Sequence, residues 1–330
     1  MLPTLSEIES AADIVYCYMA PTPQYRWPLL SQRLGVELWL KHENHVPTGA
    51  FKLRGGLVYF SDVARNPEIK EVVTATRGNH GQSVALSARR HGVSAKIVVP
   101  LGNAIEKNAA IRALGATLIE CGEDFQAARE EAVRTSSDTG AHLVPAFHPR
   151  LVQGVATYAV ELFRAEPGLT DVYVPIGLGS GICGVAAARN ALSPKTRIVG
   201  VVSAGAPSYL LSFKVGHPVE APADTWLADG MACRAPEPDA LEMILRNIDR
   251  VVAVTDQEIG QAMRDIFECT HNCAEDAGAA AVAAVAKEAH ALKGRKVAAV
   301  LSGGNVDRHI YAAVLSSPSA AGMTYGVDNA

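Results

Sequence analysis

Residues 174–184, VPIGLGSGICG, place four glycines within eight positions, directly after a β-branched apolar run. A glycine-rich turn between a strand and a helix exposes backbone N–H groups, and the dipole at that helix end favours an anion. Glycine suits such a turn because a side chain would block close approach to the backbone. The segment predicts a phosphate-binding loop, and a tight turn without a ligand is the alternative.

The same loop raises the question of a dinucleotide cofactor. Gly179, Gly181 and Gly184 satisfy G-x-G-x-x-G, but a dinucleotide site also needs an acidic residue about 20 positions further on, to bind the ribose. The next predicted strand, RIVGVVSAG (197–205), contains no Asp or Glu. The loop therefore favours a phosphate monoester, and an NAD-dependent oxidoreductase stays a remote alternative.

A lysine supplies the second piece of chemistry. Residues 41–56 read KHENHVPTGAFKLRGG, and Lys52 stands between apolar neighbours near the start of a predicted helix. Partial burial lowers the pKa of an ammonium group and makes the amine a usable nucleophile or base. A desolvated lysine together with a phosphate-monoester loop indicates pyridoxal 5′-phosphate (PLP) bound as a Schiff base.

Four segments together carry a family resemblance: PTGAFKLRGG (47–56), TRGNHGQS (76–83), GLGSG (177–181) and SGGN (302–305). In this order they resemble the fold-type II, tryptophan-synthase-β-like PLP enzymes. The likeness is greatest to the threonine/serine dehydratase and serine racemase branch, and it runs from about Pro21 to Ala313. The resemblance implies a PLP-dependent ammonia-lyase that converts a β-hydroxy-α-amino acid, threonine- or serine-like, into a 2-oxo acid and ammonia. A β-replacement synthase of the same fold and a catalytically silent binding protein are the competing hypotheses.

The resemblance also implies roles for individual residues. Lys52 would form the Schiff base and act as general base at the substrate Cα. The other expected cofactor contacts are Phe51 near the ring, Asn79 at its 3′-oxygen, Ser302 at the pyridine nitrogen, and the amides of Gly177, Leu178, Gly179, Ser180 and Gly181 at the phosphate. From the residues alone, Ser302 could instead make a turn at a strand end and Asn79 could cap a helix.

The expected substrate loop comprises Thr76, Arg77, Gly78, Asn79 and His80, whose backbone amides would bind the α-carboxylate. The family usually has serine and then a small residue at the first two positions. Serine racemases have a serine at the position of Arg77, where it acts as the second acid/base. Arginine is unsuited to that role, so racemisation is not expected. A guanidinium at position 77 could bind a second polar group, which would select 3-hydroxyaspartate, phenylserine or a hydroxyectoine-derived amino acid. Alternatively, Arg77 faces solvent or a structural acid.

Metal binding is not expected. Relatives that bind a divalent cation have a glutamate and an aspartate just after the strand that follows the phosphate loop, whereas residues 201–209 here contain no carboxylate. Cys269, His271 and Cys273 lack the paired spacing of a zinc site. Glu275 matches the family's glutamate near the cofactor, or else it caps the helix expected over 277–286.

Alternating elements must position these residues. Short apolar, β-rich runs at 36–40, 71–76, 95–100, 116–121, 197–202, 250–255 and 296–303 alternate with helical stretches, one of them from about Gly154. This pattern predicts an α/β protein with parallel sheets covered by helices on both faces. We expect two lobes of the fold-type II PLP fold, each a mostly parallel twisted sheet flanked by helices. Residues 1–70 and 149–330 would form a large PLP-binding domain, and residues 71–148 a small mobile domain that carries the substrate loop.

Composition sets the remaining expectations. With 330 residues, a formal charge of −4 and 48% hydrophobic residues, the chain gives no electrostatic reason to bind nucleic acid or an anionic membrane. Its first residues lack the pattern of a signal peptide, and its longest apolar run, 277–286, is too short for a membrane span. We expect a cytoplasmic homodimer or homotetramer that acts on a small-molecule amino acid and has no added regulatory domain.

Overall fold

The computed structural model describes residues 1–317 and contains two sheets. The larger sheet has six strands, in the spatial order β1 (Gln24–Arg26), β2 (Glu37–His42), β10 (Lys296–Leu301), β7 (Asp171–Pro175), β8 (Arg197–Ser203) and β9 (Arg250–Val254). The smaller sheet has four, in the order β5 (Thr117–Glu120), β4 (Ser94–Val99), β3 (Glu71–Ala75) and β6 (His142–Leu143). All neighbouring strands are parallel except the β1–β2 pair.

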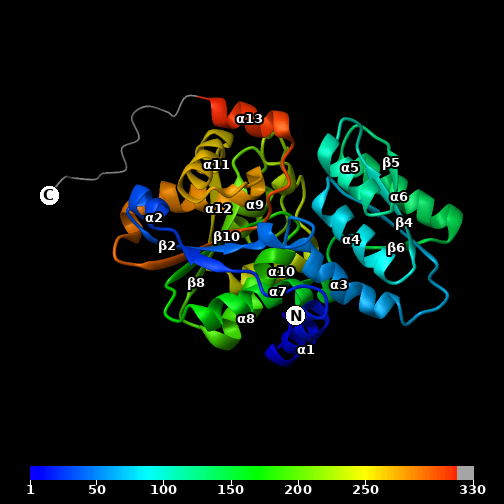
Figure 1. Cartoon of the computed structure of the whole chain (residues 1–330), viewed down its shortest axis with the longest axis horizontal. Coiled ribbons are helices and arrows are strands. Elements are labelled where there is room, and N and C mark those ends of the chain that lie inside the picture. Colours follow the sequence, from blue (N-terminus) through cyan, green and yellow to red (C-terminus); the bar gives the residue numbers. More distant parts are fainter. Residues whose placement is uncertain (318–330) are drawn as a thin grey trace.

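Helices fill the connections between these strands. In chain order they are α1 (Leu5–Tyr16), α2 (Pro28–Leu34), α3 (Lys52–Val63), α4 (Asn79–Arg90), α5 (Ile105–Ala113), α6 (Phe125–Thr139), α7 (Pro149–Ala165), α8 (Ser180–Leu192), α9 (Ser208–Val215), α10 (Pro238–Asn247), α11 (Asp256–Thr270), α12 (Asp276–Lys287) and α13 (Arg308–Ser316), with short 3-10 helices η1 (Glu43–His45), η2 (Asp229–Met231) and η3 (Ala289–Leu292). In Figure 1 the smaller sheet with α4, α5 and α6 lies beside the rest of the molecule, and α3 runs between the two parts. None of the helices within residues 1–317 is long and apolar enough to cross a membrane.

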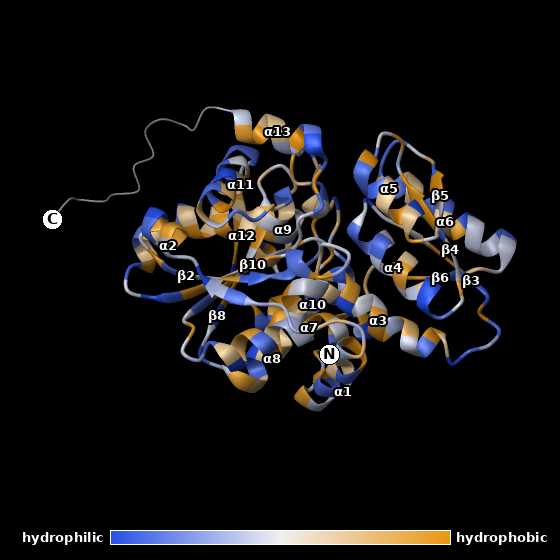
Figure 2. Cartoon of the chain, in the orientation of Figure 1, coloured by the Kyte–Doolittle hydropathy of each residue, from blue (hydrophilic) through white to orange (hydrophobic). Residues whose placement is uncertain are grey.

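The larger sheet is buried on both faces, as its continuous apolar strands predict. Along β10, Val297, Ala299 and Leu301 pack into the cluster formed with α2, α11 and α12, whereas Ala298 and Val300 pack into the cluster on the α7–α8 side. This period-two division is the geometry of a strand covered on both sides. Figure 2 shows the corresponding hydrophobic residues along the strands, with mixed polar and apolar residues on the helices outside. The predicted α/β class is confirmed.

Two helices that determine the position of Lys52 cross unusually closely. A Cβ on Gly154 of α7 would lie 2.3 Å from the backbone oxygen of Arg54 on α3, and a Cβ on Gly55 would lie 2.8 Å from the oxygen of Leu151. Glycine at these positions therefore lets the two backbones touch. The helix expected from about Gly154 begins earlier, at Pro149, because His148 Nδ1 accepts the Arg150 N–H and proline suits the first helical turn.

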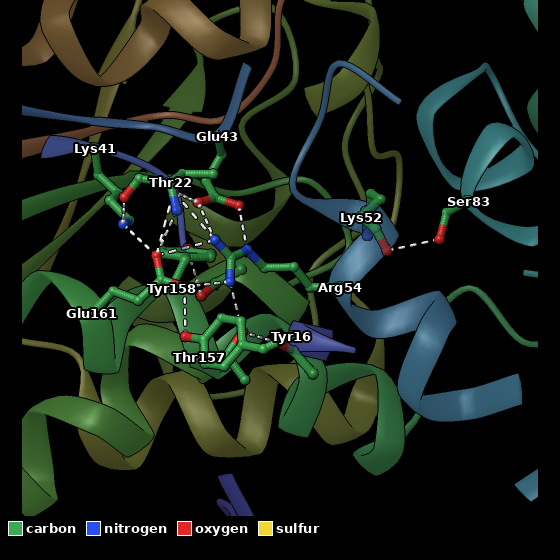
Figure 3. A network of polar contacts seen from close by, with 12 residues as sticks. Tyr16, Thr22, Lys41, Glu43, Lys52, Arg54, Ser83, Thr157, Tyr158 and Glu161 are labelled. Carbon is green, nitrogen blue, oxygen red and sulfur yellow. Dashed lines mark hydrogen bonds and ion pairs between the residues drawn. The ribbon is translucent and has the colours of Figure 1, made fainter. Parts of the chain in front are cut away.

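A buried polar network joins the same two helices (Figure 3). The guanidinium of Arg54, with no exposed surface, donates from Nε to Glu43 Oε2 (2.7 Å) and from Nη1 to Glu161 Oε1 (2.6 Å). Lys41 also pairs with Glu161, at 2.5 Å, and Thr22 donates to Glu43. Because each buried charge has an opposite charge in contact, the network is electrostatically satisfied and ties α3 to α7 and β2.

Candidate functional site

The four motif segments meet at the carboxyl ends of β3, β7 and β10. The Phe51 N–H donates to the Ser302 carbonyl oxygen (3.0 Å), and the Gly304 N–H donates to the Gly49 carbonyl oxygen (2.9 Å). These bonds hold the start of α3 against the SGGN segment. Lys52, the first residue of that helix, is therefore fixed relative to the end of β10.

One cavity of about 130 Å³ contains the predicted site. Every residue that the sequence singled out for cofactor or substrate lines it: Phe51, Lys52, Thr76, Arg77, Gly78, Asn79, His80, Gly177, Leu178, Gly179, Ser180, Gly181 and Ser302. The structure thus brings together residues as far apart in the sequence as Phe51 and Ser302, at the strand ends where parallel sheets bind ligands.

The Lys52 amine is buried, the residue as a whole is half-buried, and it lines the cavity. Burial lowers the pKa of Lys52 to about 8, and the nearby Cys233 thiol opposes that shift. Nζ donates to Ser180 Oγ at 3.0 Å. Near neutral pH a usable fraction of this amine is therefore unprotonated, as a nucleophile or base requires.

The glycine turn between β7 and α8 fits an anion. Gly179 has φ +97°, a left-handed conformation that a side chain would strain, and a Cβ on Gly177 would lie 2.5 Å from the carbonyl oxygen of Gly230. Within residues 1–317, no backbone or side-chain group accepts a hydrogen bond from the amides of residues 177–181. A helix start with free N–H groups facing a cavity is suited to a phosphate, so the turn fits the one that PLP carries.

Asn79 is the first residue of α4, and its side chain does not cap that helix. Its Nδ2 donates to Glu275 Oε1 (2.6 Å), and its Oδ1 accepts from Asn305 Nδ2 (2.8 Å). Glu275 precedes α12 without capping it through its side chain. Neither side chain therefore caps its helix, although Glu275 occupies the N-cap position of α12, and the Asn79 amide is held at the cavity wall.

Arg77 makes an ion pair across the cavity. Its Nη1 lies 2.7 Å from Asp229 Oδ1 in η2, and both side chains are about one-third exposed. Its Nε is buried and has no partner among the described residues. The structure thus places the guanidinium at the cavity with an acid in contact and its buried Nε without a partner among the described residues.

Two further groups in the cavity are neutral. Burial, followed by the charge of Lys52, lowers the pKa of His80 to about 3, and its Nε2 has no hydrogen-bond partner within residues 1–317. Burial raises the pKa of Cys233 to about 11, although Lys52 and Arg77 favour its thiolate. Around neutral pH, therefore, neither the His80 imidazole nor the Cys233 thiol carries a charge that would interact with the Lys52 amine.

Lys107, Phe125, Asp229 and Cys233 are among the residues that line the cavity and that sequence reasoning missed. None stands in a motif, and each reaches the site only through tertiary folding. Across residues 1–317, no group of three or more His, Cys, Asp or Glu side chains is arranged to bind a metal ion.

Comparison with known proteins agrees with this geometry. The family model described as "pyridoxal-phosphate dependent enzyme" matches residues 18–303. The L-threonine ammonia-lyase of Thermotoga maritima is 35% identical over 305 residues, which are 92% of this chain and 76% of that protein. The biosynthetic L-threonine dehydratase of Escherichia coli is 33% identical over 89% of this chain and 58% of its own length.

Solved structures agree as well. The processed form of threonine deaminase isoform 2 from Solanum lycopersicum superposes with a TM-score of 0.86 at 32% identity, covering 96% of this chain and 95% of that one. Maize serine racemase superposes with a TM-score of 0.88 at 27% identity, covering 94% and 96%.

The chain therefore belongs to the family of pyridoxal-phosphate dependent enzymes, and its cofactor is PLP. Within that family it is of fold type II, in the branch that contains threonine dehydratases and serine racemases. The resemblance carried by the four motifs is confirmed.

Proposed function

We propose that this enzyme is an ammonia-lyase that dehydrates and deaminates a β-hydroxy-α-amino acid, threonine or serine in the simplest case, to a 2-oxo acid and ammonia. The observation that carries the proposal is the buried Lys52 amine, which shares one cavity with a glycine turn whose amides have no acceptor in the described part of the chain. The similarity to threonine ammonia-lyases and dehydratases over about nine-tenths of the chain supports the substrate class.

The residues present would hold PLP as follows. Lys52 is the amine that would bind its aldehyde carbon, and the amides of residues 177–181 would bind its phosphate. Phe51 would pack near the ring, Asn79 would donate to the 3′-oxygen, and Ser302 would face the pyridine nitrogen; all of these residues line the cavity. When bound, PLP supplies an electron sink that weakens the bonds at the substrate Cα.

Lys52 Nζ is the base for the Cα proton. Its pKa of about 8 lets it accept a proton and release it again near neutral pH. The hydroxyl of Ser180, 3.0 Å away, restricts the positions that Nζ can occupy. His80 and Cys233 beside it are neutral near pH 7. The Lys52 amine is therefore the group suited to take up the proton at that wall of the cavity.

The substrate carboxylate would bind at the start of α4. Thr76 Oγ1 accepts the N–H groups of Gly78 (2.9 Å) and Gly81 (3.2 Å), which shapes the turn. The amides of Arg77, Asn79 and His80 have no acceptor within residues 1–317. Three free donors at a helix N-terminus suit a carboxylate.

Arg77 supports a second candidate substrate, an acidic or larger β-hydroxy amino acid. Its unpartnered Nε could donate to a second carboxylate while Nη1 keeps Asp229. Threonine and 3-hydroxyaspartate, compared in the wild type and in Arg77→Ala, distinguish the two candidates. Selection by Arg77 requires that the variant lose activity toward the acidic substrate much more than toward threonine.

We also propose the organisation around the site. Residues 71–148 would form a small mobile domain that closes over the substrate, and residues 1–70 and 149–317 the large PLP-binding domain; the predicted end of that domain, residues 318–330, lies outside the described residues. The enzyme would be a cytoplasmic homodimer or homotetramer that acts on serine as well as threonine. Analytical ultracentrifugation tests the assembly directly.

The deciding experiment is borohydride reduction of the holoenzyme followed by peptide mapping. We expect the reduced cofactor on Lys52, release of 2-oxo acid from at least one β-hydroxy amino acid, and loss of both in Lys52→Ala. Lys96→Ala, which removes a lysine paired with Glu71 outside the cavity, is the matched control. Label at another residue would refute the assignment, and product formation that depends on an added thiol would indicate a β-replacement synthase instead.

A further inference from the structure

A buried ion pair that the proposed function does not use lies in the wall of the cavity. Lys107 Nζ, in the first turn of α5, is 3.2 Å from Glu275 Oε2, and the two side chains are 8% and 2% exposed. Burial alone would lower the pKa of Lys107, but Glu275, Asp276 and Asp229 facing it raise that pKa well above its ordinary range. The lysine is therefore a permanent cation at this wall.

The hydrocarbon part of Lys107 packs on the substrate loop. Gly78, with φ +151°, leaves no room for a side chain, because a Cβ there would lie 2.4 Å from Lys107 Cδ. One side chain thus touches the turn before α4 with its stem and Glu275 with its charge.

Glu275, which pairs with Lys107, also accepts a hydrogen bond from the side chain of Asn79. A carboxamide has two N–H groups and one oxygen. At Asn79, one N–H donates to Glu275 Oε1 (2.6 Å) and the oxygen accepts from Asn305 (2.8 Å). The two partners fix the amide orientation and leave one N–H for the cofactor. Reversing the amide would place its oxygen against the Glu275 carboxylate.

We propose that Lys107 is a positioning residue for the cofactor: by neutralising Glu275 it keeps that carboxylate as an acceptor, and so holds the Asn79 amide with its free N–H toward the cofactor. The inference rests on the proposed function, because it assumes that Asn79 contacts the cofactor. Lys107 itself transfers no proton and forms no bond to substrate.

Loss of the cation should make the site sensitive to pH. Burial, with Glu275 and Asp229 adding to it, raises the pKa of Asp276 to about 7, while Lys107 and the Ala277 amide oppose that shift. Arg77 and Lys52 are the other cavity cations, and Arg77 is already paired with Asp229. Without Lys107, therefore, Asp276 would bind a proton up to a higher pH, and the charge balance beside the acceptor of Asn79 would change as the pH falls.

The test uses holoenzyme in which Lys107 is replaced. Lys107→Met keeps a linear stem and removes the charge, Lys107→Arg keeps the charge, and Lys107→Gln is a second neutral variant in case the first does not fold. Lys96→Met removes a partly exposed ion pair of the smaller sheet and is the matched control. The readouts are the cofactor dissociation constant, from the visible absorbance retained on serial dilution, and its dependence on pH, with far-UV circular dichroism as the check of folding.

We expect the neutral variants to bind PLP about tenfold more weakly or worse, with a deficit that grows from alkaline to mildly acidic pH. Lys107→Arg should recover most of the affinity. Adding Glu275→Gln to Lys107→Met should also recover part of it, because an amide oxygen can accept from Asn79 without a counter-charge. A purely structural role would give weaker binding at every pH and no rescue by the second substitution.

Wild-type affinity and an unchanged pH profile in a folded neutral variant would overturn the inference. That result leaves the proposed function intact as long as borohydride labels Lys52 in the same variant. Absence of label at Lys52 in the wild type would instead refute the function on which the inference rests.

Discussion

Replacing Arg54 by methionine tests how firmly the helix that begins with Lys52 is held. Arg54 is fully buried and makes charged hydrogen bonds to Glu43 and Glu161, together with neutral ones to Thr22 and Thr157 (Figure 3). Methionine fills much of the same space but donates nothing, so two buried carboxylates lose their shared partner. Removal of one member of a buried pair costs about 3–5 kcal/mol, because it leaves an uncompensated charge.

The remaining contacts decide where in that range the loss falls. Glu161 keeps Lys41 at 2.5 Å, whereas among residues 1–317 Glu43 keeps only the hydroxyl of Thr22, also at 2.5 Å. We therefore expect a loss of about 3 kcal/mol in the free energy of unfolding, near the lower end of the range. Arg65→Met, which breaks an exposed pair with Asp62 at 3.5 Å, should change stability by less than about 0.5 kcal/mol.

The loss should depend on pH in a definite direction. Burial would raise the pKa of Glu161, but Arg54 and Lys41 hold it below its ordinary value. A carboxylate with a lowered folded-state pKa contributes stability above its unfolded-state pKa, and that contribution is lost as pH falls through the folded value. The difference between wild type and Arg54→Met should therefore be largest near neutral pH and shrink in acid.

Urea unfolding followed by circular dichroism at several pH values measures this difference. Adding Glu43→Gln to Arg54→Met should recover part of the stability, since it removes the more isolated charge. A loss below about 1 kcal/mol, or one that is equal at every pH, would show that the network is not electrostatically coupled as its geometry indicates.

Three further predictions concern backbone contact, the phosphate turn and the lysine. Gly154→Ala should destabilise the protein by about 1–3 kcal/mol in urea, because its Cβ would press on the backbone of Arg54; an unchanged midpoint contradicts the close crossing. Gly179→Ala should strain a left-handed residue by about 1–3 kcal/mol and weaken cofactor retention on dilution, with circular dichroism unchanged; retention equal to wild type contradicts the role of the turn. The rate at which apo-enzyme recaptures PLP should rise with pH and level off above about 8, since only the neutral Lys52 amine attacks; stopped-flow absorbance would reveal a flat profile if the amine is not the nucleophile.

Sequence patterns identified the elements of this fold because burial imposes them locally. A parallel strand covered on both faces must be continuously apolar, so the runs at 71–76, 95–100 and 296–303 correspond to β3, β4 and β10. The ends of the helices are less predictable. Helix α7 begins five residues before Gly154, because Pro149 and the cap made by His148 start it outside the apolar pattern.

The residues of the site and the residues that support it also differ in how well the sequence predicts them. Lys52 and the turn at 177–181 could be recognised because a special backbone and a desolvated amine leave local marks in the sequence. Glu43, Arg54 and Glu161 leave none, since charged residues 11 and 107 positions apart meet only after α3 has packed on α7. Gly154 is required at that contact because the backbone of Arg54 faces it. The sequence alone does not show which backbone lies opposite this glycine.

The helix that carries Lys52 and the part of the chain that carries the substrate loop are held to the rest of the molecule by different contacts. This difference affects how the site could close over a substrate. Lys52 belongs to a helix held by buried charges and touching backbones. The smaller sheet instead meets α13 through reciprocal caps: Asp307 accepts the amides of Ile105 (2.8 Å) and Glu106 (3.1 Å), and Glu106 accepts the amide of Arg308 (2.9 Å). Hydrogen bonds to charged groups contribute about 1.5–3 kcal/mol each, and these lie in part-buried or exposed positions where water can replace them. An opening motion of residues 71–148, as proposed, would break these caps together with the Arg77–Asp229 and Lys107–Glu275 ion pairs, whereas the ties of α3 to α7 and β2 would stay intact.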